Sequence, residues 1–228
     1  MTILQTSPQA LLADIHAAGY WRVVMHPSTF NEHRISTPQR CWEIVADAQV
    51  GYRPYAVYPY LRERERDYDQ DWVQFGGDSG QGLQFWRFHQ SGQFIHNFAM
   101  SEDVFDDQGQ RALNTLEMLY TLTEIMKFAS RLAHQNVLEP AALIQVELHN
   151  IQGRALVGAR GVPLEGGPYT AESDPVVWRA TPSSLALIAT SKEIAVDAAM
   201  SIFAQFGWRD ASRESLLREQ KRFVTGRW

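Results

Sequence analysis

Cysteine is almost absent from this sequence: Cys41 is the only one in 228 residues. A single thiol cannot form an internal disulfide, and it cannot build a zinc site made of cysteines. Chains without disulfides are typical of reducing compartments. We therefore expect a cytoplasmic protein.

Long apolar runs are also missing. No stretch approaches the roughly 18 consecutive apolar residues that a membrane-spanning helix needs. The first residues lack the charged start, the apolar run and the small-residue cleavage site of a signal peptide. We therefore expect a protein that is neither secreted nor bound to a membrane.

Positive charge is in deficit, with 21 Lys and Arg against 26 Asp and Glu and a formal net charge of −5. A surface devoted to nucleic acid requires clustered Lys and Arg that neutralise phosphates. This balance excludes a nucleic-acid footprint over the whole surface. Nucleic-acid binding through a local patch remains open.

What is present is an ordinary globular composition, 45% hydrophobic and 21% charged, with several helix signals. Ser7 and Pro8 predict a helix that ends at Gly19, and Thr37 with Pro38 predicts a second. Apolar residues recur at helical spacing in residues 115–135, which Asn114 can cap. Further helices are expected at residues 192–206, capped by Ser191, and at residues 212–224.

Apolar alternation predicts strands at residues 20–27, 71–75, 83–90, 93–100, 142–150 and 176–179. Ser91 and Gly92 read as a two-residue hairpin turn, and residues 153–159 as the hairpin partner of residues 142–150. These elements predict an α+β fold, in which a mostly antiparallel sheet of hairpins packs against a long central helix. Residues 1–160 would form the core domain, and residues 161–228 a Gly/Pro-rich connector with a C-terminal helical portion packed on it.

The segment Gly77-Asp78-Ser79-Gly80 is similar to the nucleophile loop of trypsin-like serine proteases. That resemblance stops at four residues, because Gln81 replaces the following glycine and no disulfide framework exists. A serine nucleophile also needs a histidine base and an oxyanion hole. The surrounding glycines are what a tight connection between strands requires. We interpret Ser79 as part of a turn.

A metal site is an alternative. A two-residue turn at Ser91 and Gly92 would place His89 and His96 diagonally on one face of the hairpin, within reach of a shared ion. Glu147 could complete the ligand set. Half-buried histidines beside Phe85, Phe94 and Phe98 explain the same pattern without a metal.

The aromatic and arginine-bearing segment from residue 52 to residue 66 is the candidate binding surface. Exposed aromatic rings interleaved with arginines suit a protein partner or stacked bases. Ordinary core packing is the alternative. The candidate binding residues are Tyr52, Arg53, Tyr55, Tyr58, Arg62 and Arg64.

Four segments carry a family resemblance: "HPSTF", "FWRFHQSGQFIHNF", "TLEMLYTLTEIMKFASRLA" and "IQVELHNIQGRAL". Together they resemble an uncharacterised bacterial region that, in some proteins, is joined to a Schlafen/AlbA-like nucleic-acid-binding domain. The resemblance covers most of residues 20–160. It implies a sensor, adaptor or oligomerisation module in a regulatory or anti-phage defence system, and it carries no catalytic motif.

From these observations we expect a non-enzymatic protein-interaction or sensor/adaptor module that needs no cofactor. Its partner would be another protein or a second copy of the chain. The competing hypothesis is a metal-dependent hydrolase or nuclease with a site near residues 76–98, including Asp78, His89, His96 and Glu147.

Overall fold

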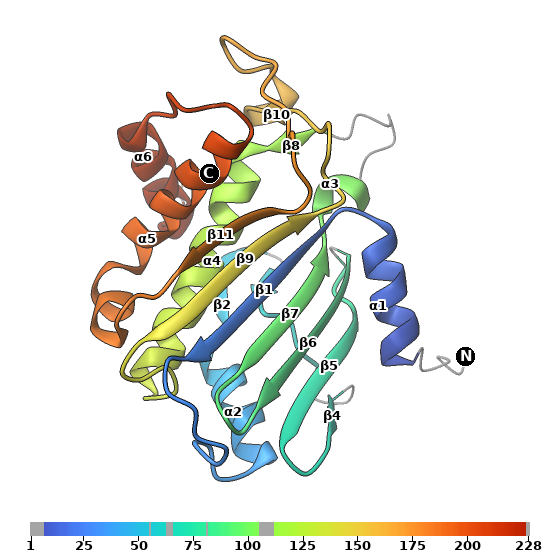
Figure 1. Cartoon of the computed structure of the whole chain (residues 1–228), viewed down its shortest axis with the longest axis vertical. Coiled ribbons are helices and arrows are strands. Elements are labelled where there is room, and N and C mark those ends of the chain that lie inside the picture. The colour runs from blue at the N-terminus through green and yellow to red at the C-terminus, as the bar shows by residue number, and fades with distance from the viewer. Residues whose placement is uncertain (1–6, 55, 63–65, 81, 105–111, 227–228) are drawn as a thin grey trace.

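The computed structural model describes residues 7–54, 56–62, 66–80, 82–104 and 112–226 (Figure 1). Within these residues the main sheet has seven strands in the order β11-β9-β1-β7-β6-β5-β4, and all neighbouring pairs are antiparallel. The strands are β1 Tyr20–Pro27, β4 Arg66–Tyr68, β5 Trp72–Asp78, β6 Leu83–His89, β7 Phe94–Ala99, β9 Ala142–His149 and β11 Val176–Ala180.

Helices cover the two faces of the main sheet unequally. Figure 1 shows α4 and α2 behind the strands, with α5 and α6 beside α4, whereas α1 lies on the opposite face against β5, β6 and β7. The helices are α1 Pro8–Ala17, α2 Pro38–Ala48, α3 Ser101–Val104, α4 Thr115–His134, α5 Ser184–Gln205 and α6 Arg213–Val224, with a 3-10 turn at Ala159–Gly161. The predicted α+β fold is confirmed.

Side-chain caps begin the helices where the sequence predicts them. Ser7 Oγ accepts a hydrogen bond from Ala10 N at 3.2 Å, and Thr37 Oγ1 accepts one from Arg40 N at 3.0 Å. Asn114 Oδ1 accepts from two backbone N–H groups at the start of α4. Each cap satisfies donors that the first helical turn leaves without an intrahelical partner.

The start of α5 differs from its prediction. The cap is Ser183 rather than Ser191, because Ser183 Oγ accepts from Ala186 N at 3.1 Å. The helix then runs through the predicted cap position with a kink at Thr190, where φ is −131°. Thr190 Oγ1 donates to Ala186 O at 2.9 Å, a bond to the preceding turn that accompanies bends in helices.

The β6–β7 hairpin forms, but its register differs from the prediction by one residue. His89 N donates to Gln93 O at 2.9 Å, so the loop contains three residues and ends at Gly92, whose φ is +86°. Trp86 therefore pairs with His96, where a two-residue turn would pair Arg87 with it. Because side chains alternate between faces, this one-residue shift moves His96 to the face that the helices cover.

The predicted hairpin partner of residues 142–150 is wrong. The neighbours of β9 are β1 and β11. Residues 153–159 instead contribute β10 Leu156–Val157, which pairs in parallel with β8 Leu113–Asn114 immediately before α4. A second small sheet joins β2 Val50–Arg53 to β3 Ala56–Tyr58 beside α4.

The main core lies between the sheet and α4. Trp86, Phe94 and Phe128 are fully buried there, and residues of the C-terminal helices, such as Phe203 and Phe223, belong to the same cluster. A separate small cluster on the other face joins α1 to the sheet through Leu11, Ile15, Tyr20 and Phe85. In the part of the chain that the structure describes, no helix is both long and apolar enough to cross a membrane.

Candidate functional site: an acidic cavity beside α4

The groups of the proposed metal site do not come together. His89 lies on the face of the sheet that carries α1, which we call the open face. Its Nδ1 is 3.6 Å from Asp71 Oδ2. His96 lies on the helix-covered face and is only 1% exposed. Among the described residues, no cluster of three or more His, Cys, Asp or Glu side chains could hold a metal ion. The register of the β6–β7 hairpin is the reason that this predicted site is not assembled.

Glu147 belongs to a polar network on the open face. Its carboxylate accepts hydrogen bonds from Arg22 Nη1 at 2.9 Å and from Gln145, and it contacts His149 Nε2 at 2.7 Å. Burial alone would raise the pKa of Glu147, but the hydrogen bonds from His149, Gln145 and Arg22 together lower it. The network explains Glu147 as an ion-paired residue of the sheet surface.

Ser79 lies in the connection between β5 and β6. Its Oγ donates to Gly82 O at 3.1 Å, and Asp78 Oδ1 accepts from Gly80 N at 2.7 Å. Gly80 has φ +80°, which glycine adopts without steric cost. This is the turn that the sequence predicts between Asp78 and Leu83.

The predicted aromatic and arginine-rich surface is largely turned inward. Tyr58 is 7% exposed, and Tyr52 packs against Phe223 with ring centroids 5.6 Å apart. Arg62, by contrast, is exposed as predicted, and it donates to the Tyr60 hydroxyl and lies over its ring. Burial occurs because β2 and β3 form a hairpin that contacts α4. The exposed surface was therefore a wrong prediction at Tyr58, while Tyr55 and Arg64 lie outside the described residues.

Arg53 and Tyr58 nevertheless line a cavity of about 330 Å³, which we call the acidic cavity. It lies between α4, the β2–β3 hairpin and the helix-covered face of β1, β6 and β7. Its carboxyl groups, among the described residues, come from α3 and from the first half of α4. Those residues are Glu102, Glu117 and Glu124.

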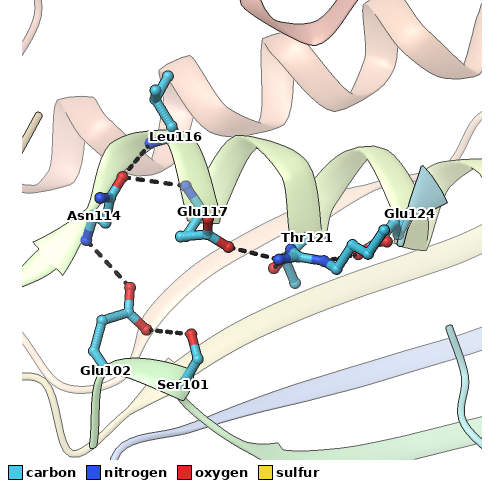
Figure 2. Close-up of polar contacts among 8 residues, drawn as sticks. Ser101, Glu102, Asn114, Leu116, Glu117, Thr121 and Glu124 are labelled. Carbon is cyan, nitrogen blue, oxygen red and sulfur yellow. Dashed lines mark hydrogen bonds and ion pairs between the residues drawn. The ribbon is translucent and has the colours of Figure 1, made fainter. Parts of the chain in front are cut away.

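Arg53 holds one side of the acidic cavity. Its Nη1 donates to Glu117 Oε2 at 2.6 Å, its Nε to Glu124 Oε2 at 3.0 Å, and its Nη2 to Thr121 Oγ1 at 3.3 Å. Figure 2 shows Glu117, Thr121 and Glu124 on the same side of α4, because positions i, i+4 and i+7 share a helix face. One guanidinium thus bridges two successive turns of the helix.

Glu102 enters the same region from α3. One carboxylate oxygen accepts from Asn114 N at 3.2 Å and the other from Ser101 Oγ at 3.1 Å, as Figure 2 shows. Burial raises the pKa of Glu102 despite these hydrogen bonds. Its neighbour Asp103 points elsewhere, toward Arg154 and Gly19 N. Of these two adjacent acidic residues, Glu102 therefore lines the cavity, whereas Asp103 forms an ion pair with Arg154.

Glu124 has the most perturbed carboxyl group of the site. Its side chain is 5% exposed, and burial raises its pKa to about 7 even though Arg53 acts in the opposite direction. The acidic partner Glu117, 40% exposed, adds to the rise. Burial of Glu124, to which the charge of Glu117 adds, therefore outweighs the effect of the one guanidinium on this pKa.

His96 and Tyr58 form the inner wall of the cavity, with ring centroids 5.3 Å apart. His96 Nε2 lies 3.2 Å from Gln84 Oε1, and because a carbonyl oxygen only accepts, Nε2 carries the hydrogen. Burial lowers the pKa of His96 to about 3, so the ring is neutral and Nδ1 is an acceptor. Neither Nδ1 nor the Tyr58 hydroxyl has a hydrogen-bond partner within the described residues.

The cavity was not among the sequence predictions, although part of its signal was present. Glu117, Thr121 and Glu124 interrupt the apolar pattern of residues 115–135 at spacings that share one face. Arg53 is separated from Glu117 by 64 positions and from Glu124 by 71. That pairing depends on the tertiary fold. Comparison with known proteins adds no further assignment, since no protein-family model, no curated protein and no solved structure matches the chain.

Proposed function

We propose that this protein is a non-enzymatic sensor and adaptor module that binds a small polar molecule in the acidic cavity. The observation that carries the proposal is the cavity that Tyr58 and His96 line together with Arg53 and its carboxylates, because the Tyr58 hydroxyl and His96 Nδ1 are buried and have no hydrogen-bond partner within the described residues. Buried polar groups are normally hydrogen-bonded, so each such group calls for an explanation. A ligand that inserts between these two side chains would supply the missing partners.

Binding is favoured over catalysis by the way the acidic groups are held. Glu124 has the raised pKa that a general acid or base requires. However, Arg53 occupies one of its oxygens, and the oxygens of Glu102 accept from the chain itself. These contacts fix the geometry of a recognition site. The metal-dependent alternative loses its support, since His89 and His96 lie on opposite faces of the sheet.

The adaptor part of the proposal is supported by a route from the cavity to α6. The Arg53 guanidinium lies 5.7 Å from the ring centroid of Phe223 in α6, and that ring stacks on Tyr120 at 4.2 Å. A ligand that competes for Glu117 or Glu124 would change the position of Arg53 and hence its contact with α6. A partner protein that recognises α6 could read this change. The regulatory or anti-phage setting rests only on the family resemblance of residues 20–160.

The test is a ligand screen combined with a variant that fills the cavity. Fragments carrying amine, acid or neutral polar groups are screened against the protein by ligand-observed NMR. Ala56→Trp places a large ring at the half-buried cavity wall, and Val162→Trp adds the same ring at a position that is 60% exposed and does not line the cavity. We expect fragments that bind the native protein and Val162→Trp but not Ala56→Trp. If no fragment shows this dependence on residue 56, the proposal is wrong.

A further inference from the structure

The hydrogen-bonding character of the acidic cavity defines what kind of molecule fits it. Ionised carboxylates only accept, the neutral His96 keeps Nδ1 as a further acceptor, and the Tyr58 hydroxyl can donate or accept. The strongest donor of the site, Arg53, is already directed at Glu117, Glu124 and Thr121. The cavity therefore offers more acceptors than donors, and a complementary ligand must be rich in N–H donors.

Aromatic rings form the opposite wall. Trp21 and Phe98 are stacked with centroids 6.0 Å apart, and Tyr58 meets Phe98 edge to face at 6.0 Å. All of these residues line the cavity. Aromatic faces attract cations through the ring quadrupole, and they pack against apolar groups. The wall thus suits a ligand that combines an apolar or aromatic body with a positively charged group.

From these contacts we infer that the ligand is a small organic cation, an amine or a guanidinium attached to an apolar body, with its charged group among Glu102, Glu117, Glu124 and His96. This inference rests on the proposed function, since it names the ligand class of the same cavity. The direction of the carboxyl pKa values agrees with it, because a cation would favour the ionised form of Glu124 and Glu102. An anion would meet the same carboxylates and a guanidinium that is already occupied.

The experiment compares three probes of similar size that differ in charge: benzylamine, benzyl alcohol and benzoate. Their affinities are measured by isothermal titration calorimetry at pH 7.5, where benzylamine is protonated. We expect benzylamine to bind about tenfold or more tightly than benzyl alcohol and benzoate to bind least, because charge-assisted hydrogen bonds are the stronger ones. Equal affinities, or tightest binding of benzoate, would overturn the cation inference and leave the ligand-binding proposal standing.

Variants of the cavity glutamates test which carboxylates cause the preference for a cation. Glu124→Gln removes the buried charge with little change of shape, and Glu117→Gln does so at the half-exposed partner. Each should reduce benzylamine affinity about tenfold while changing benzyl alcohol affinity less than about twofold. The matched control is Glu193→Gln, an exposed α5 residue outside the cavity, which should alter neither.

The variants also separate the two proposals. Benzyl alcohol binding reports whether each variant is folded, and Glu117→Gln keeps the test available if Glu124→Gln does not fold. A native protein that binds none of the three probes overturns the cation inference, whereas the wider screen with Ala56→Trp decides the proposed function independently. Benzylamine binding that is unaffected by both glutamine variants would also overturn the inference.

Discussion

The two faces of the main sheet are built from the same strands but have different roles. Toward the helices, β1 presents Trp21, Val23 and Met25 to a continuous apolar core. Toward the open face it presents Arg22 and Val24, which remain half-buried. Since side chains alternate along a strand, one sequence specifies both surfaces at once. The helix-covered face carries the larger apolar cluster, and its polar cavity is the exception that requires a functional explanation.

The glutamates of the two faces make the contrast sharper. Glu147 on the open face receives hydrogen bonds from several neighbours, and its pKa is lowered. Glu124 on the covered face is more deeply enclosed, and burial raises its pKa to about 7 despite Arg53. A glutamate side chain is therefore stabilised as an anion on the open face, whereas burial on the covered face favours its neutral form. A buried carboxyl group with too few hydrogen-bond donors around it therefore indicates the candidate site better than the mere presence of an acidic residue does.

The largest expected effect is on the covered face. Phe128 is fully buried between Tyr58 and Phe94, and Phe128→Ala should reduce the free energy of unfolding by about 3 to 5 kcal/mol through lost burial and a cavity. Phe85→Ala removes the same ring from the small cluster under α1 and should cost less. Urea unfolding followed by tryptophan fluorescence measures both. Equal losses would show that the two faces contribute equally, and the comparison would fail.

The second prediction concerns pH dependence inside the cavity. The pKa of Glu124 is about 7 against an ordinary 4.5, so between pH 4.5 and 7 the unfolded chain has released a proton that the folded protein keeps. The pKa of His96 is about 3 against 6.5, so between pH 6.5 and 3 the unfolded chain binds a proton that the folded protein excludes. Glu124 thus lowers the free energy of unfolding as pH rises, and His96 lowers it as pH falls, each by about 1.4 kcal/mol per pH unit.

Between pH 4.5 and 6.5 these two contributions have opposite slopes and cancel. Glu124→Gln removes one of them, so the variant should lose stability by about 1.4 kcal/mol per pH unit on acidification relative to the native protein. Urea unfolding at half-unit steps of pH measures the difference, and Glu193→Gln is the control for surface charge. Parallel stability curves for the native protein and Glu124→Gln would show that Glu124 is an ordinary carboxylate.

Features that depend on residues close together in the sequence were easier to predict than features that depend on residues far apart in it. Caps such as Ser7, Thr37 and Asn114 act within three residues, and their helices begin where expected. The short apolar strands of the sheet were likewise readable from alternation. The partner of β9 was not, because β1 and β11 lie far from it along the chain and the nearer segment, residues 153–159, pairs with β8.

The candidate site was less accessible to sequence reasoning, for two physical reasons. A single residue in the β6–β7 loop decides the face on which His96 lies, and a glycine at Gly92 fits either a two-residue or a three-residue turn. The contacts of Arg53 with Glu117 and Glu124 join segments that only the fold brings together. Tyr58 and Arg53 were chosen as binding residues for an exposed surface, whereas they line a cavity.

A smaller effect is expected where α1 covers the open face. Leu11 packs directly on the sheet, since a Cβ added to Gly76 would lie 2.7 Å from Leu11 Cδ2. Leu11→Ala should reduce the free energy of unfolding by about 2 kcal/mol, at the low end for a buried leucine because the cluster is small. Leu12→Ala, at a half-buried position, is the matched control. Hydrogen exchange should show α1 opening more readily in Leu11→Ala with α4 unchanged; equal acceleration in both helices would contradict the separation of the two clusters.

The smallest expected effect is in the polar network of the open face. Glu147→Gln removes the charge that pairs with Arg22, whose side chain is 37% exposed, so solvent screening limits the loss to below about 1 kcal/mol. Because the pKa of Glu147 is lowered, its contribution is present above pH 4.5 and disappears as pH falls through the folded value. Arg22→Ala and the double variant, measured by urea unfolding at low and high salt, give the coupling between the two residues. A coupling of several kcal/mol that survives high salt would mean that the open face is held together as firmly as the covered one, and Glu147 would then rank beside Glu124 as a buried charge that needs its own explanation.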